Sequence, residues 1–503
     1  MGGVVAREGQ DRPGSAGRCP RRRRSSACRR LQRQRDGARR DRPVPEVPLT
    51  THPDPPSTGV RRIAVLSVSA LLVLVAPPLY LLLDLAVVGR LGGHELAALG
   101  VGTLVLATIS TQLTFLSYGT TARSARLFGA GDRVGAVREG VQATWVALGV
   151  GVVLIILAYP LAPVAMGALV GSGEDGAAEV VDEATRWLRI AMFGVPLILA
   201  SMAGNGWMRG VQETRRPVLF VLCGLSFGAV GVVGLVHGLG WFPRLGLTGS
   251  AVANVVGQSI TGALFVGRLV GESRRGDTPL PLRPDWSIIA AQLLMARDLI
   301  LRSLSFQVCF VSATAVAARF GIAAVAAHQV AVQVWDFLSL LLDSVAIAAQ
   351  ALVGAALGAG ATGVAVTVAR RVTVVAVAIA VAVAVVFAVG AGMIPGVFTH
   401  DAEVRDAMAV PWWFLVGMLP IAAVVFALDG VLLGAGDVVF LRKATMFSAL
   451  CGFLPLIWLS LVFGWGLAGI WSGLVALMVL RLVLVVGRVL GGRWQRVGAD
   501  AVT

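Results

Sequence analysis

The chain has 503 residues, of which 56% are hydrophobic and 14% charged, and its formal net charge is +15. A soluble globular protein carries about 25% charged residues, so the composition excludes that class and indicates a membrane protein. Most of the positive charge lies in residues 1–62, where sixteen arginines stand against six acidic residues. Because no aromatic residues are interleaved with these arginines, they do not predict nucleic-acid binding.

Residues 1–60 form an Arg- and Pro-rich segment without an apolar period. A stretch of this kind cannot bury a core, so we expect a disordered cytoplasmic tail, with a patch for anionic membrane lipid as the alternative. The five cysteines form no CxxC pair and no cluster with histidine. We therefore expect no metal site, no disulfide framework and no bound cofactor.

Twelve apolar segments follow, each about as long as the roughly 20 residues that cross a hydrocarbon core. They span residues 63–89, 97–121, 140–168, 187–209, 217–239, 247–270, 298–319, 325–354, 372–394, 411–434, 443–463 and 466–489. A charged linker with three prolines, residues 271–287, divides them six and six. The chain is thus predicted to be an all-α integral membrane protein with a first lobe at 61–270, a second at 288–490 and a tail at 491–503.

The loops after even-numbered spans are rich in arginine, and two of the loops after odd-numbered spans are acidic. Lysine and arginine favour the cytoplasmic side of a membrane. We therefore expect a multi-pass protein of a bacterial inner membrane with both termini in the cytoplasm.

The two halves repeat each other at several landmarks. Gly129-Ala130-Gly131 recurs as Gly358-Ala359-Gly360, 229 positions later, and Asn205-Gly206 recurs as Asp429-Gly430, 224 positions later. Because each half has an even number of spans, the copies are parallel repeats. Such repeats place a substrate cavity between two bundles.

Asp84 is the first candidate functional residue, because a carboxylate within a span costs roughly 2.5–3.5 kcal/mol on insertion scales. It follows the pair Pro77-Pro78, which removes two backbone donors and predicts a bend. A carboxylate beyond such a bend, away from water, can take up and release a proton. Tyr80 lies between the bend and Asp84, and we assign it to the substrate cavity. The alternative for Asp84 is an interfacial carboxylate that is only hydrogen-bonded.

The eighth span carries a polar stripe on an otherwise aliphatic helix. Gln329, Asp336, Asp343 and Gln350 recur every seven residues, and Gln333 joins the same side. Such a stripe must face protein or water rather than lipid. We assign Gln333, Asp336 and Asp343 to the substrate cavity, where acids suit a cationic cargo. The alternative is helix packing through hydrogen bonds.

Asp429 and Asn205 occupy equivalent places, one turn before an inner loop. A structural or gating role at the cytoplasmic end suits both of them. The acids Asp336 and Asp343 lie two helical turns apart, which is too far for an aspartyl dyad, and no catalytic motif occurs elsewhere. We therefore predict a protein that is not an enzyme.

Four stretches resemble the multidrug and toxic compound extrusion (MATE) family and its DinF branch. They read APPLYLLLDLAVVGRLGGHELAALGVG (76–102), RDLILRSLSF (297–306), AARFGIAAVAAHQVAVQVWDFLSLLLDSVAIAAQALVGAALGAG (317–360) and FALDGVLLGAGDVVFLRKATM (426–446). The resemblance implies two six-helix lobes in a V and drug efflux driven by a proton or sodium gradient. It also implies that Asp84 is the essential acid of the first helix.

The fifth span departs from this family. Members often carry an Asn and an Asp there, whereas Gly228 and Val232 stand near those places. A lone carboxylate can carry a proton but makes a poor sodium cage, so proton coupling is our hypothesis. We expect a cationic or amphiphilic small-molecule substrate and a monomer in the lipid bilayer.

Two other transporter classes remain as alternatives. A major-facilitator exporter also has twelve spans in parallel halves, and GAGDRVGAVR (129–138) resembles its loop motif. A lipid-linked precursor flippase would need cationic residues in its cavity for pyrophosphate, whereas the buried charges that we identify in the sequence are acidic.

Overall fold

The computed structural model describes residues 59–171, 176–275 and 280–498. All regular structure in these residues is helical, and twelve of the helices are long and apolar enough to cross a membrane. The predicted all-α class and the count of twelve spans are confirmed. The predicted tail at 1–60 lies outside the described residues except for its last two positions.

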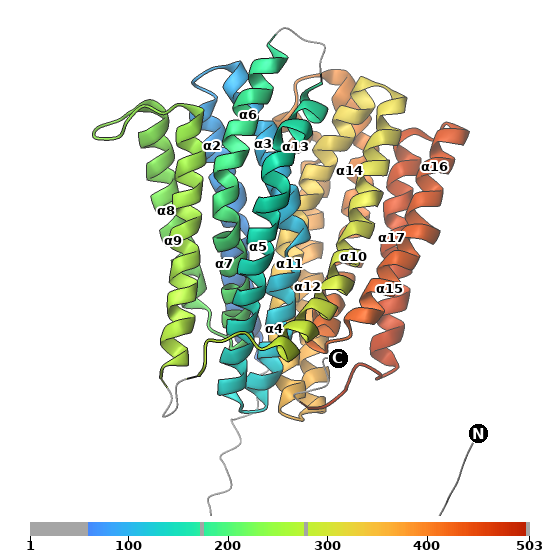
Figure 1. The fold of residues 1–503 in the computed structure, drawn as a ribbon. Helices are drawn as coiled ribbons and strands as arrows, with labels where there is room; N and C mark the ends of the chain where they lie inside the picture. Colours follow the sequence, from blue (N-terminus) through green and yellow to red (C-terminus); the bar gives the residue numbers. More distant parts are fainter. Residues whose placement is uncertain (1–58, 172–175, 276–279, 499–503) are drawn as a thin grey trace, which may run out of the picture. The chain divides into compact units, whose positions relative to one another are not determined.

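Eight helices come from the first half of the chain (Figure 1): α2 (Val60–Val88), α3 (Gly93–Gln112), α4 (Phe115–Gly129), α5 (Arg133–Val170), α6 (Ala177–Ala191), α7 (Val195–Gly210), α8 (Arg215–His237) and α9 (Leu247–Ser273). Two spans are interrupted within the membrane. The second span breaks between α3 and α4, and the fourth passes through a 3-10 turn at Met192–Gly194.

Eight more helices make the second half: α10 (Trp286–Ala317), α11 (Ile322–Gly358), α12 (Thr362–Val389), α13 (Ile394–Phe398), α14 (Ala402–Gly434), α15 (Val438–Ser448), α16 (Leu454–Phe463) and α17 (Gly466–Leu490). A π-helical turn at Ala449–Phe453 joins α15 to α16. Helix α10 begins twelve residues before the predicted span, where the Asp285 side chain accepts from the Ser287 backbone N–H at 3.0 Å and caps the helix.

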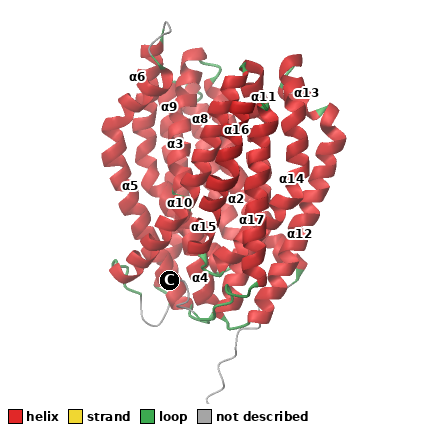
Figure 2. Cartoon of the chain, turned by 90° about the vertical axis from the view of Figure 1, so that its right-hand side faces the viewer, coloured by secondary structure: helices red, strands yellow, loops and turns green. Residues whose placement is uncertain are grey.

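The long helices run beside one another, and their connections gather at two ends (Figures 1 and 2). The end with the arginine-rich loops after even-numbered spans is called the basic end below. Helix α11 is central: it packs against α12 and α14 of its own half and against α2 and α4 of the other. Its segment from Ser344 to Leu357 is buried without interruption.

The repeat is visible in how α4 and α11 pack at the basic end. A Cβ atom on Gly129 would lie 1.9 Å from the carbonyl oxygen of Ala355, and one on Gly358 would lie 2.0 Å from that of Arg126. Positions 126 and 355 are themselves 229 apart, as are the two glycines. The two contacts are therefore copies of each other, and each lets the helix backbones touch because glycine has no side chain.

A second pair of contacts repeats within each half. Gly206 of α7 packs on Ser117 of α4, where an added Cβ would lie 2.5 Å from the carbonyl oxygen. Its counterpart Gly430 of α14 packs on Ala346 of α11, with a corresponding distance of 2.2 Å. The fourth span thus packs on the second as the tenth packs on the eighth.

Residues 280–285 of the linker are attached to α5. The Trp145 indole donates to the carbonyl of Leu282 at 2.7 Å, and the Gln142 amide donates to that of Arg283 at 3.0 Å. Arg138 pairs with Asp285 at 2.5 Å. The second half therefore begins from a segment held by the first.

Candidate functional site

Asp84 lies in the last turn of α2 and is only 1% exposed. Its Oδ2 accepts a hydrogen bond from the Ser250 hydroxyl of α9 at 2.8 Å, and Ser250 accepts one from the Trp187 indole of α6 at 3.1 Å. Its Oδ1 has no partner, and no cation pairs with it among the described residues. A buried carboxylate without a cation is costly when ionised, so this site suits a group that binds and releases a proton.

A second polar side chain lies close to Asp84 on the same helix. Tyr80, one turn earlier on α2, is buried with its hydroxyl unpartnered. Gly228 makes room for Tyr80, because a Cβ there would lie 3.0 Å from the ring. Tyr80 therefore stands beside Asp84 in the first half and not in the cavity described below.

Sequence reasoning looked for partners of Asp84 on the fifth span and missed those on the sixth. Gly228 and Val232 are both buried in α8, but the donor Ser250 belongs to α9. The available signal was the pair Ser250 and Asn254, two polar side chains one turn apart in an apolar segment.

Helix α2 continues through Pro77 and Pro78, both of which are exposed. The loss of two backbone donors at these positions leaves the helix with fewer hydrogen bonds than its neighbours. A hinge below Asp84 stays a prediction.

The polar stripe of α11 changes its surroundings along the helix. Gln329, Gln333 and Asp336, toward the end opposite the basic end, are exposed. Asp343 follows, half-buried, and Gln350 is buried with its amide donating to the Tyr118 carbonyl at 2.7 Å. The stripe thus runs from exposed positions into the contact between α11 and α4.

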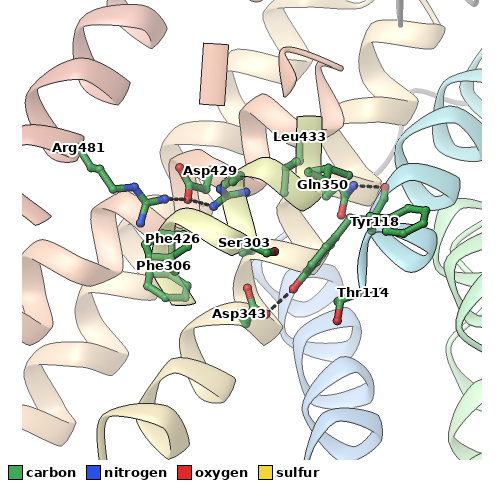
Figure 3. Close-up of a pocket in the computed structure, with 14 residues that line it drawn as sticks. Thr114, Tyr118, Ser303, Phe306, Asp343, Gln350, Phe426, Asp429, Leu433 and Arg481 are labelled. Atoms are coloured by element: carbon green, nitrogen blue, oxygen red, sulfur yellow. Dashed lines mark hydrogen bonds and ion pairs between the residues drawn. The ribbon is translucent and has the colours of Figure 1, made fainter. Parts of the chain in front are cut away.

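Asp343 lines a cavity of about 190 Å³ between the two halves, shown in Figure 3. The first half contributes Thr114, Phe115 and Tyr118, and the second half contributes the rest of the lining. The Tyr118 hydroxyl donates to Asp343 Oδ2 at 2.5 Å. The predicted placement of Gln333 and Asp336 in a cavity is not tested, since neither lines this one.

Two arginines face Asp429 in the same cavity (Figure 3). Arg302 of α10 donates to Asp429 Oδ2 at 2.6 Å, and Arg481 of α17 pairs with the same oxygen. Asp429 therefore holds together α10, α14 and α17 near the basic end. Its repeat partner Asn205 is also buried, with its side-chain oxygen unpartnered.

These arginines correct the expectation that the buried charges are acidic. Arg481 is 2% exposed, and Arg209 of α7 is 9% exposed with one hydrogen bond to the Ser117 hydroxyl at 3.3 Å. Sequence reasoning missed them because it searched the spans for carboxylates alone and counted Arg209, at the end of the fourth span, as loop charge. Buried cations are therefore present, and their expected absence no longer disfavours a flippase.

No group of three His, Cys, Asp or Glu side chains in the described part of the chain could hold a metal ion. Ion pairing, hydrogen bonding and proton exchange are the chemistry that these residues offer. They combine a lone carboxylate in the first half with a charged cavity between the halves.

Comparisons with known proteins agree with this architecture. The profile of the MatE family matches residues 70–233 and 299–458. DNA damage-inducible protein F of Escherichia coli (strain K12) is 29% identical over 83% of this chain and 88% of its own. Protein DETOXIFICATION 44, chloroplastic, of Arabidopsis thaliana is 28% identical over 87% of this chain and 85% of its own.

Solved structures share the fold. A MATE protein in a bent conformation superposes with a TM-score of 0.77 and 23% identity, covering 86% of this chain and 94% of that one. An outward-facing MATE transporter gives a TM-score of 0.73 and 23% identity, covering 87% and 96%.

Proposed function

We propose, since the chain belongs to the MatE family of multidrug efflux transporters, that it exports small molecules by alternating access in exchange for protons. Family membership sets aside the major-facilitator alternative. The arginine-rich loops support an orientation with the basic end and both termini in the cytoplasm of a bacterial inner membrane. We further propose that a single chain in the lipid bilayer is the working unit, with an ion gradient as its energy source.

The observation that carries this proposal is the isolation of Asp84. It is 1% exposed, one of its oxygens has no partner, and the other is bound by a neutral hydroxyl. A sodium ion needs several oxygen ligands around it, and beside Asp84 the side chains named here offer only the neutral hydroxyls of Ser250 and Tyr80. A proton needs only the carboxylate, which favours protons over sodium as the coupling ion.

Alternating access also needs one end to close while the other opens. At the basic end, Arg126 of α4 donates to the carbonyls of Ala435 at 2.6 Å and Gly498 at 2.9 Å, both in the second half. The contacts of Gly129 and Gly358 seal α4 against α11 at the same end. These contacts close the basic end and support an outward-open state.

A proton that binds Asp84 would remove the negative charge near the C-terminal end of α2. The paired prolines lie below that point, where α2 lacks two backbone hydrogen bonds. We propose that protonation of Asp84 favours one conformation of α2 and so links proton movement to the cargo. Small cationic or amphiphilic compounds are the first cargo class to test, because Asp343 lines the cavity and Asp336 lies two turns from it on α11.

Efflux of the fluorescent cation ethidium from energised cells tests the proposal. Wild type and Asp84→Asn are compared at equal membrane abundance, with the exposed Asp406→Asn as the matched control. Export by wild type and the control, but not by Asp84→Asn, is expected. Equal export by Asp84→Asn would show that Asp84 does not couple transport. If none of several dyes is exported, the multidrug proposal is replaced by transport of one dedicated cargo or of a lipid-linked precursor.

A further inference from the structure

Two cations of the central cavity share one carboxylate oxygen. Arg302 and Arg481 both pair with Oδ2 of Asp429. Asp343, the other carboxylate in the lining, accepts instead from the Tyr118 hydroxyl. Because buried charges are stable only when they are paired, two guanidinium groups on one aspartate leave a place for a second anion.

The unused hydrogen-bond donors of the two arginines also indicate a site for an anion. The Nε atoms of Arg302 and Arg481 are buried and have no partner in the described residues. Asp343 already accepts from the Tyr118 hydroxyl. An arginine guanidinium offers five donors in a planar fork that matches a carboxylate, so the two arginines have donors to spare.

An apolar surface lies next to these donors. The Arg481 guanidinium stands 4.9 Å from the centre of the Phe306 ring, and that of Arg302 stands 6.0 Å from it. Phe306, Phe426 and Leu433 line the same cavity. Aromatic and aliphatic walls with a few oriented polar groups are typical of small-molecule sites.

We infer that Arg302 and Arg481 bind a carboxylate of the exported molecule, whose aromatic or aliphatic body packs against Phe306 and Phe426. This inference rests on the proposed function and extends its cargo from cationic compounds to small organic acids and zwitterions. Asp429 Oδ1, which is also unpartnered, would accept a donor group of a zwitterion. The cavity of about 190 Å³ suits a body of one or two rings.

Three probes with one aromatic body test this inference on the purified full chain. They are 2-naphthoate, its neutral amide and the cationic 2-naphthylmethylammonium, and their binding is measured by calorimetry. Wild type is expected to bind the carboxylate about ten- to one-hundredfold more tightly than the amide, the range of a charge-assisted hydrogen bond. Equal affinities, tightest binding of the cation, or no binding of any probe would overturn it.

Variants then identify the binding group. Arg302→Gln is expected to lower naphthoate affinity roughly tenfold or more and to leave amide affinity within about twofold, whereas Arg302→Lys keeps part of the preference. Arg123→Gln is the matched control: Arg123 and Arg302 both have 16% of the side chain exposed and pair with a carboxylate at 2.6 Å. Equal loss of both probes, or the same loss in the control, would refute the assignment.

The experiments distinguish a failure of proton coupling at Asp84 from a failure of the carboxylate site. If Asp84→Asn still exports ethidium while the naphthoate preference holds, proton coupling is wrong and the carboxylate site stands. If Asp84→Asn abolishes export but the acid and amide bind alike, the coupling stands and the carboxylate site is wrong.

Discussion

The two halves share a backbone repeat and differ in electrostatics. In the first half, Asp84 is buried with one neutral hydroxyl as its partner. In the second, Asp429 is held by two arginines. The repeat offset of 229 places Ala313 opposite Asp84 and Val73 opposite Arg302, so neither charge has a copy. This difference underlies our proposal that one fold carries a proton site in one half and a cargo site beside the other.

The shared part of the repeat is made of small residues. The contacts of Gly129 with Ala355 and of Gly358 with Arg126 are symmetric to within 0.1 Å in the distance of an added Cβ, 1.9 Å against 2.0 Å. Close helix contacts in membranes depend on small residues because lipid supplies no hydrophobic force between helices. The glycines thus maintain the common framework, while the charges differentiate the halves.

The largest effect is expected from removing the carboxylate of the second half. Asp429→Asn leaves Arg302 and Arg481 without a counter-ion, which costs about 3–5 kcal/mol for a buried pair. Thermal unfolding of the purified protein in detergent measures the loss. The double variant Asp429→Asn/Arg481→Met should recover part of it, since one unpaired cation is removed. A single variant as stable as wild type would show that the second half does not depend on this pairing.

A smaller and symmetric effect is expected from the repeat contacts. Gly129→Leu and Gly358→Leu each force a side chain into a helix backbone, at a cost of about 1–3 kcal/mol for overpacking. Both should open the basic end and raise the reactivity of a reporter cysteine placed at Ser124 toward a membrane-impermeant thiol reagent in everted vesicles. Gly363→Leu, where a Cβ meets nothing within 4 Å, is the control. An effect in only one of the two variants would show that the contacts of Gly129 and Gly358 are not equivalent.

The smallest effects are expected from removing the single hydrogen bonds that Asp84 and Asp343 accept. Ser250→Ala removes the donor to Asp84, and Tyr118→Phe removes the donor to Asp343, each at about 0.5–1.5 kcal/mol. Ser250→Ala should alter the pH dependence of transport, while Tyr118→Phe should alter cargo affinity at unchanged pH dependence. The reverse outcome would exchange the roles that we assign to the two halves.

Most of the architecture could be predicted from the sequence, because each span is an apolar run bounded by charged loops. The repeat was also visible, since its glycines recur at a fixed offset. The partners of the buried charged residues could not be predicted. Ser250 follows Asp84 by 166 positions, and Arg481 follows Asp429 by 52, so the pairing depends on which helix faces lie together. The arginines are a further difficulty, because Arg302 and Arg481 lie inside predicted spans, where hydropathy alone does not show which side chains are buried between helices.

Transport by the purified protein in sealed liposomes tests the central claim that Asp84 couples cargo to protons. A pH gradient imposed without sodium is predicted to drive ethidium uptake by wild type and not by Asp84→Asn, and a sodium gradient at equal pH is predicted to drive neither. Uptake that requires the sodium gradient and ignores the pH gradient would contradict the account.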